Sequence, residues 1–240
     1  MERALKQYLE LAELSDELAF VALKGIGATD LDVVLYQAHS ALMARTLTDL
    51  RAACQLAVSG YTMQSWSVAA SCFEAAHSIG YIGSDSARAT RWVEHSDRHR
   101  APWGAKDAVQ NAIIFLSLEA DTKKRQELVD REYSLYETLC IAKHVNPIAE
   151  KFRYFYRRDT FQVLRLSPVS THRRIAEAKK GLIVAIRCTS TGIWALLDAH
   201  HQGNEALRRQ LIAIMETTDS LVQELVPVSG DTDAAEPTDA

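Results

Sequence analysis

The chain has 240 residues, of which 48% are hydrophobic and 24% charged, a composition typical of a folded globular domain. Its formal net charge is −4, and residues 227–240 hold four acidic residues and no lysine or arginine, so residues 1–226 are formally neutral. A neutral body excludes a broadly basic surface for nucleic acid, although a local basic patch stays open.

Helical periodicity begins near the N-terminus. The pattern predicts a first helix over residues 3–23, with one apolar side formed by Leu5, Leu9, Ala12, Ala19 and Phe20. Gly25 is expected to end this helix, and Thr29 or Asp30 to cap the next one.

Residues 33–82 predict two long helices that fold back on each other at Ser59 and Gly60. Arg45 lies 15 residues before Gly60 and Glu74 lies 14 after it. At 1.5 Å per residue, both stand roughly 21–22 Å from the turn. The hairpin therefore predicts a level contact between Arg45 and Glu74.

Four ionisable residues interrupt otherwise apolar or small-residue faces of this hairpin: Arg45 and Asp49 on the first helix, Glu74 and His77 on the second. One hypothesis is a polar pocket, in which His77 exchanges protons and Arg45 holds an anion. The other is an inter-helix ion pair that fixes the register of the two helices. Two acids and one arginine nearly balance, which favours the structural bridge.

Further helices are predicted over residues 84–92, with a cap in the Ser84-Asp85-Ser86 stretch, and over 105–118, 122–145, 168–201 and from Gly203 to about 225. Five prolines and 10 glycines favour such long helices over a sheet-rich chain. The expected fold is an all-α, multi-helix bundle in a single domain over 1–226, with a long antiparallel hairpin over about 33–82. The tail over 227–240 is expected to be disordered.

A short basic stretch follows the hairpin and contains Arg88, Arg91, Trp92 and His95. Arginine beside aromatic residues suits phosphate contacts and base stacking, so this stretch is a candidate RNA patch. Acidic residues are interleaved with it, and a solvated connector would have the same composition.

Residues 152–166 break the helical pattern, because they are rich in aromatic and β-branched residues around a polar centre. The composition predicts a small β-hairpin insertion. Its candidate interaction surface comprises Tyr154, Tyr156, Arg157 and Arg158, since tyrosine and arginine are enriched at interaction hot spots. Packing of the hairpin on the helices would explain several of its aromatic residues equally well.

The cysteines, Cys54, Cys72, Cys140 and Cys188, are far apart and form no CxxC spacing. We expect no metal site and no cofactor. The N-terminus is charged throughout, so it does not predict a signal peptide, and the strongest apolar run is too short to cross a bilayer. The expected location is the cytoplasm, with no membrane association.

Several segments together carry a resemblance to a known family: residues 44–50, 60–61, 69–74, 133–144, 146–147 and 167–168. Over roughly residues 35–200 the chain resembles a family of uncharacterised bacterial helical proteins, a domain of unknown function. Ser71 and Cys72 depart from it, because a second arginine is expected before Phe73 and Glu74. If the family's polar centre uses that arginine, its role is in doubt in this chain.

That family is similar in layout to the HEPN helical domains, some of which are ribonucleases of bacterial defence. Their motif is an arginine followed, after four to six residues, by a histidine. Arg88 with His95 and Arg165 with His172 have this spacing. With 18 arginines and 8 histidines in the chain, about two such matches are expected by chance, so the motif by itself does not indicate a ribonuclease.

The sequence therefore favours a non-catalytic interaction module that acts through a protein partner or through homo-oligomers. The alternative is an HEPN-like ribonuclease or an RNA-binding protein of a bacterial defence or stress system.

Overall fold

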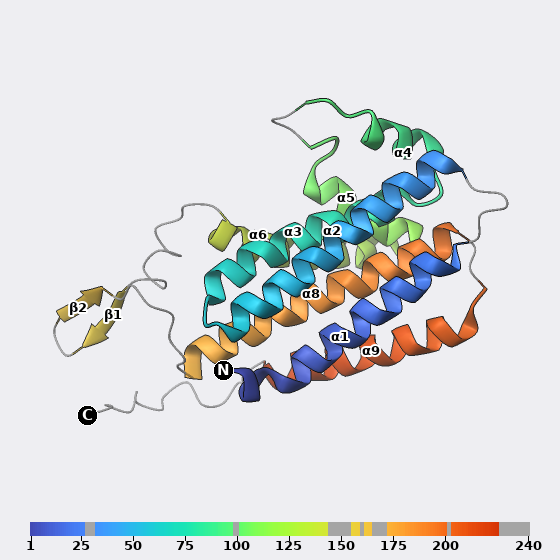
Figure 1. The fold of residues 1–240 in the computed structure, drawn as a ribbon. Helices are drawn as coiled ribbons and strands as arrows, with labels where there is room; N and C mark the ends of the chain where they lie inside the picture. The colour runs from blue at the N-terminus through green and yellow to red at the C-terminus, as the bar shows by residue number, and fades with distance from the viewer. Residues whose placement is uncertain are drawn as a thin grey trace.

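The structure, a computed structural model, describes residues 1–26, 32–97, 101–143, 155–158, 161–164, 172–200 and 203–225. These residues form eight helices: α1 (Glu2–Gly25), α2 (Val33–Val58), α3 (Thr62–Ile82), α4 (Ser86–Val93), α5 (Ala105–Phe115), α6 (Thr122–Lys143), α8 (His172–Ala199) and α9 (Glu205–Leu225). Figure 1 shows them packed as a bundle. The predicted all-α class is confirmed.

Helix α8 lies at the centre of the bundle, where it packs against α1, α2, α3 and α9 (Figure 1). Five of its large apolar side chains are fully buried: Leu182, Ile186, Ile193, Leu196 and Leu197. Within the described residues, Arg174–Ala199 is the one segment long and apolar enough to cross a membrane, but 72% of its most apolar window is buried inside the bundle. Burial against the other helices accounts for its composition.

The turn between α2 and α3 is formed as the sequence predicts. Gly60 has a φ of 81°, in the left-handed region that glycine adopts without strain. The amide of Tyr61 donates to the carbonyl of Leu56 at 2.8 Å, and the amide of Gly60 donates to that of Ala57 at 3.1 Å. This pair of bonds is a Schellman motif, which satisfies the last carbonyls of α2 and starts α3 in the antiparallel direction.

The cap of α2 differs from the prediction, because Asp32 takes this position instead of Thr29 or Asp30. Its carboxylate accepts the amides of Val34 and Leu35 at 3.0 and 3.1 Å. The second carboxylate oxygen accepts the hydroxyl of Ser86 at the start of α4. The hydrogen bond from Ser86 and the helix amides lower the pKa of Asp32. One residue thus caps a helix and ties it to α4.

Two predictions differ from the structure: the burial of Phe20 and the end of the helix that begins at residue 105. Phe20 was expected on the buried side of the first helix, but it is 53% exposed, because the buried stripe of α1 runs through Leu11, Leu18 and Ala19 instead. The helix predicted over 105–118 ends earlier, at Phe115. Ser117 there has a φ of 50°, which breaks the helical path.

Two close approaches between helices depend on glycine. A Cβ at Gly80 in α3 would lie 2.5 Å from the Cβ of Ala112 in α5. A Cβ at Gly181 in α8 would lie 2.6 Å from the indole of Trp66, whose Nε1 donates to the carbonyl of Glu177 at 2.7 Å. The absence of side chains at these two positions lets α5 and α8 sit directly against α3.

Strands β1 (Phe155–Arg158) and β2 (Phe161–Leu164) pair antiparallel, with Phe155 opposite Leu164 and Arg158 opposite Phe161. The rest of the predicted insertion over 152–166 lies outside the described residues, so the insertion stays a prediction. The predicted tail over 227–240 also lies outside them.

Candidate functional site

Arg45 of α2 binds within its own helix and to the neighbouring helix α3. Its Nε donates to the carboxylate of Asp49 at 2.7 Å, and its Nη2 donates to the hydroxyl of Ser71 at 2.9 Å. The Arg45 side chain is 60% exposed and that of Asp49 is 9% exposed. The guanidinium therefore covers a nearly buried carboxylate and faces solvent on its other side.

Glu74 of α3 is held by α6. Its Oε1 accepts the hydroxyl of Tyr136 at 2.5 Å and the ammonium of Lys143 at 2.7 Å. The Tyr136 ring also stacks on Phe73, with centroids 5.2 Å apart. Burial and the hydrogen bond to Glu74 raise the pKa of Tyr136, so its hydroxyl stays protonated as the donor. Glu74 thus ties α6 to the hairpin.

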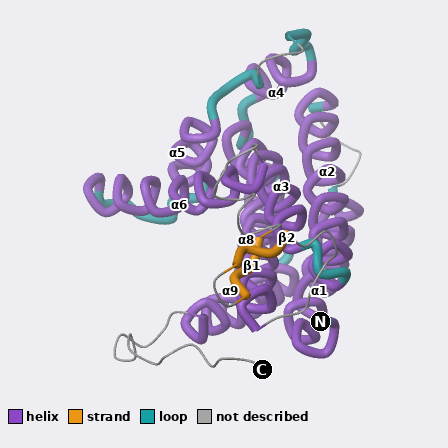
Figure 2. Tube along the Cα trace, turned by 90° about the vertical axis from the view of Figure 1, so that its left-hand side faces the viewer, coloured by secondary structure: helices purple, strands orange, loops and turns teal. Residues whose placement is uncertain are grey.

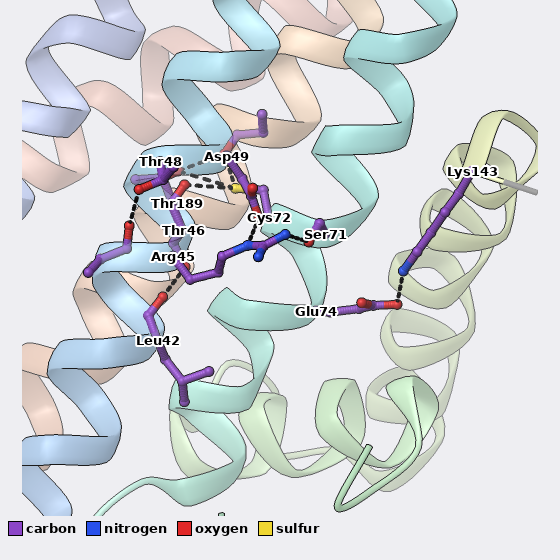
Figure 3. Close-up of polar contacts among 12 residues, drawn as sticks. Leu42, Arg45, Thr46, Thr48, Asp49, Ser71, Cys72, Glu74, Lys143 and Thr189 are labelled. Atoms are coloured by element: carbon purple, nitrogen blue, oxygen red, sulfur yellow. Dashed lines mark hydrogen bonds and ion pairs between the residues drawn. The ribbon is translucent and has the colours of Figure 1, made fainter. Parts of the chain in front are cut away.

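The predicted Arg45–Glu74 contact is wrong. Figure 3 shows Arg45 turned toward Ser71, and Glu74 turned away from Arg45 toward Lys143. The equal distances from Gly60 give the height of Arg45 and Glu74 along the hairpin, but they do not give the direction in which each side chain points around its helix axis. Ser71 and Glu74 are three residues apart in α3, so their side chains are offset by about 60° around its axis. This offset is enough for Ser71 to meet Arg45 of α2 while Glu74 meets Lys143 of α6. The hairpin has two separate polar ties instead of one bridge.

We expect the two ties to differ in strength. Tyr136→Phe removes a hydrogen bond to a charged carboxylate and should lower the free energy of unfolding by about 1–2 kcal/mol. Arg45→Gln should lower it by less than about 1 kcal/mol, because Arg45 is largely exposed. Urea denaturation of the two variants measures both changes. A larger loss for Arg45→Gln would contradict this ranking.

His77 lies deep in the bundle, one turn beyond Phe73 on α3. Its Nδ1 lies 2.9 Å from the carbonyl of Phe73, and its ring stacks on the Phe73 ring with centroids 3.9 Å apart. A carbonyl only accepts, so Nδ1 carries the proton and Nε2 keeps a free lone pair. Burial lowers the pKa of His77, and the Phe73 carbonyl opposes this shift. His77 is therefore a neutral hydrogen-bond acceptor at neutral pH.

A cavity of about 230 Å³ has His77 on its wall. It lies between α3, α5, α6, α8 and α9, and its lining comprises His77, Ala112, Ile113, Leu116, Leu118, Leu128, Arg131, Glu132, Arg187, Thr191, Met215 and Asp219. In Figure 2, α5 and α6 project from one side of the bundle, next to α8. His77 is thus the one residue of the predicted polar cluster that lines this cavity.

The central charged pair of this cavity joins α8 to α6. Nη2 of Arg187 lies 3.0 Å from Oε1 of Glu132, and Nη2 of Arg131 lies 3.6 Å from the same oxygen. The side chains of Arg187 and Glu132 are 30% and 15% exposed, so the pair is well shielded from water. Both partners act on the pKa of His77, Glu132 raising it and Arg187 lowering it. The imidazole and the ion pair therefore share one electrostatic environment.

The chain matches no protein-family model, no curated protein and no solved structure. The resemblance to uncharacterised helical proteins and the HEPN-like layout stay predictions.

Two arginines of the candidate RNA patch already donate to backbone carbonyls within the fold. Arg88 donates from Nη1 to the carbonyl of Tyr81 at 2.5 Å, and its guanidinium lies over the Tyr81 ring at 4.6 Å. Arg91 donates to the carbonyl of Pro102 at 2.7 Å, and Trp92 packs against the core. These contacts hold α4 on the bundle and leave fewer donors for phosphate. The RNA hypotheses stay predictions.

The candidate interaction surface on the β-hairpin cannot be placed. Tyr154 lies outside the described residues, and the side chains of Tyr156, Arg157 and Arg158 are not described either. This surface also stays a prediction.

The described cysteines are free thiols in protected positions. Burial raises the pKa of Cys54 to about 11 and that of Cys72 to about 12. A thiolate is the reactive form, so these two thiols are not activated nucleophiles at neutral pH. Within the described ranges, no group of three or more His, Cys, Asp or Glu side chains could hold a metal ion.

A histidine pair was missed by the sequence reasoning. Nδ1 of His39 in α2 lies 3.1 Å from Nε2 of His200, which directly follows α8. Burial, and then the neighbouring His200, lower the pKa of His39 to about 3. The carbonyl of Ile79 opposes the shift without forming a well-aligned hydrogen bond to Nε2. Nothing in the sequence joins His39 to a residue 161 positions away.

The ion pair of the cavity was missed too, although a signal for it exists. Arg187 interrupts the apolar run of α8, directly after Ile186 and one turn after Ile183. A charged residue in a central helix needs a partner. The sequence does not say which acid provides it, because α6 carries Glu127, Asp130, Glu132 and Glu137.

Proposed function

We propose that this protein is a non-catalytic helical interaction module that binds a partner protein through the outer face of α1. The observation that carries the proposal is a set of three apolar side chains on this face. Leu14, Phe20 and Val21 are 51%, 53% and 48% exposed, while the opposite face of α1 is buried on the bundle. Leu14 and Val21 share one stripe of α1, two turns apart, and Phe20 is the neighbour of Val21 in sequence. Exposed large apolar side chains grouped on one helix face are a feature of interaction sites.

The charges around these side chains favour a basic partner. Glu10, Glu13 and Glu17 are exposed on the same face, and helical periodicity places Glu17 between the apolar side chains. Two lysines of this face already have partners: Lys6 pairs with Glu10 at 3.6 Å, and Lys24 lies over the Phe20 ring at 4.5 Å. A symmetric antiparallel contact between two copies of α1 would bring the two Glu17 carboxylates together, which is unfavourable. We therefore favour a partner that presents a basic amphipathic helix.

The contacts of three charged side chains and the pKa values of two cysteines support a binding role rather than a catalytic one. Arg45, Glu74 and Arg88 each hold one helix on another. Cys54 and Cys72 have raised pKa values. None of these five side chains is an activated nucleophile or a free general base.

The test replaces Leu14 and Val21 together with glutamate. The wild type should bind an amphipathic peptide of leucine and lysine, and salt should weaken this binding. The double variant should bind it at least about tenfold more weakly, because it loses the two apolar contacts. Fluorescence anisotropy measures the affinity, and sedimentation velocity shows whether a second copy uses the same face.

The matched control is Ile114→Glu, which places a glutamate at a 46% exposed apolar position on α5. It should leave peptide affinity unchanged. Equal weakening by the control and the double variant would show that the loss is not specific to the α1 face, and the proposal would fail.

A further inference from the structure

The cavity between α3, α5, α6, α8 and α9 is not used by the α1 surface. Its apolar lining comes from three directions, since α5 and the residues after it, α6 and α9 each contribute to it: Ala112, Ile113, Leu116, Leu118, Leu128 and Met215. Its polar groups come mainly from α3, α6 and α8. An apolar lining with a few convergent polar groups is the usual constitution of a small-molecule site.

The guanidinium of Arg187 keeps donors beyond its ion pair. Its contact with Glu132 is made by Nη2, at 3.0 Å. A guanidinium has five N–H donors in a planar fork. Nη1 of Arg187 can therefore donate to a carboxylate in the cavity while Nη2 stays on Glu132. Because Arg187 is only 30% exposed, such a contact is shielded from water.

The imidazole of His77 supplies the complementary group. Its Nδ1–H is used by the Phe73 carbonyl at 2.9 Å, so Nε2 can only accept. A ligand that meets this atom must present a hydroxyl or an ammonium donor. An apolar ligand would leave the lone pair of Nε2 without a partner, which is costly in a buried site.

We propose that this cavity binds a small carboxylate with a branched apolar chain and a hydroxyl or ammonium donor on its 2-carbon. The carboxylate lies on Arg187, the donor on His77, and the chain against Ile113, Leu116 and Met215. The cavity of about 230 Å³ equals the share of roughly eight water molecules in the liquid, which suits an acid of about six to nine heavy atoms. A 2-hydroxy acid and a 2-amino acid share this chemistry.

Three probes share one carbon skeleton and differ in the group on the 2-carbon that would donate to His77: 2-hydroxy-4-methylpentanoate, leucine and 4-methylpentanoate. Isothermal titration calorimetry on the full-length protein measures their affinities. One or both of the first two should bind at least about tenfold more tightly than 4-methylpentanoate, which lacks the donor for His77. The stronger of the two identifies the source of the donor.

Two variants test the site. Arg187→Gln should weaken binding of the best probe about tenfold or more. Because this change also leaves Glu132 without its partner, Met215→Trp serves as a second variant that fills the cavity and alters no charge. It should abolish binding. The matched control is Arg51→Gln, which removes an arginine from a bidentate pair with Asp16, at 2.9 and 2.8 Å, on the far side between α1 and α2. It should leave binding unchanged.

The result that overturns the proposal is absence of heat and of a shift in melting temperature for all three acids at millimolar concentration. Binding that survives Met215→Trp overturns it as well. Failure of the α1 peptide assay does not bear on it, because the two surfaces are separate.

Discussion

Gly80→Ala is expected to lower the free energy of unfolding by about 1–3 kcal/mol, although alanine favours a helix over glycine by about 1 kcal/mol. The new Cβ would lie 2.5 Å from the Cβ of Ala112 and 3.0 Å from its Cα. Neither atom can rotate away, since both belong to the rigid part of α5. The clash must push α5 off α3, and overpacking of this kind outweighs the gain in helix propensity. Urea denaturation with a linear extrapolation measures the change.

The control for this variant is Gly203→Ala, because a Cβ at Gly203 meets nothing within 4 Å. It should change the free energy of unfolding by less than about 0.5 kcal/mol. A second substitution, Ala112→Gly, should recover part of the loss in the Gly80→Ala background, and a double-mutant cycle isolates this coupling. If Gly80→Ala were as stable as the wild type, the close packing of α3 on α5 would be disproved.

The helices could be predicted from the sequence because their signals are local. Gly60 ends α2, and Asp85 caps α4 through the amides of Ala87 and Arg88 at 2.9 and 3.1 Å. These effects act within a few residues, so a pattern of letters contains them. The cap of α2 was misassigned because Thr29, Asp30 and Asp32 are all capable of the role, and the hydroxyl of Ser86, 54 positions later, is an added partner of Asp32.

The partners of charged side chains could not be predicted in the same way. The residues of the hairpin gave the height of Arg45 and Glu74, but the choice between facing each other and facing other helices depends on where α6 packs. Tyr136 and Lys143 bring α6 to Glu74 from 62 and 69 positions away. The cavity combines five helices for the same reason, and only His77 among its polar residues was singled out by the sequence. Long-range packing decides such pairs.

The two proposed binding sites differ in kind: one is an exposed helix face and the other is a cavity between helices. The outer face of α1 is exposed and carries apolar and acidic side chains, which suits a partner helix. The cavity lies between α3, α5, α6, α8 and α9, and it suits a small acid. Since α8 packs on both α1 and α9 and carries Arg187, a ligand in the cavity would contact the same central helix on which the α1 surface rests.

Lowering the pH from 7 to 5 is expected to reduce the free energy of unfolding by about 2 kcal/mol through His39, with a further loss through the buried His77. The pKa of His39 is lowered to about 3, and that of His77 is lowered by burial as well. In the unfolded chain both titrate near the ordinary value of about 6.5. Below that pH the unfolded state binds protons that the folded state does not, so stability falls with pH. His39 contributes about 1.4 kcal/mol per pH unit, or about 2 kcal/mol at pH 5. His77 adds a loss of the same sign.

The measurement is the free energy of unfolding in urea at several pH values between 7.5 and 5, the window set by the lowered pKa values. His39→Gln and His77→Gln each remove one titrating group, so each should reduce the slope of stability against pH, whatever its stability at pH 7. The control, Ile212→Ala, alters an exposed residue that does not titrate and should keep the full slope. A wild-type slope near zero in this window would mean that both imidazoles accept protons without unfolding, and it would contradict their burial as neutral groups.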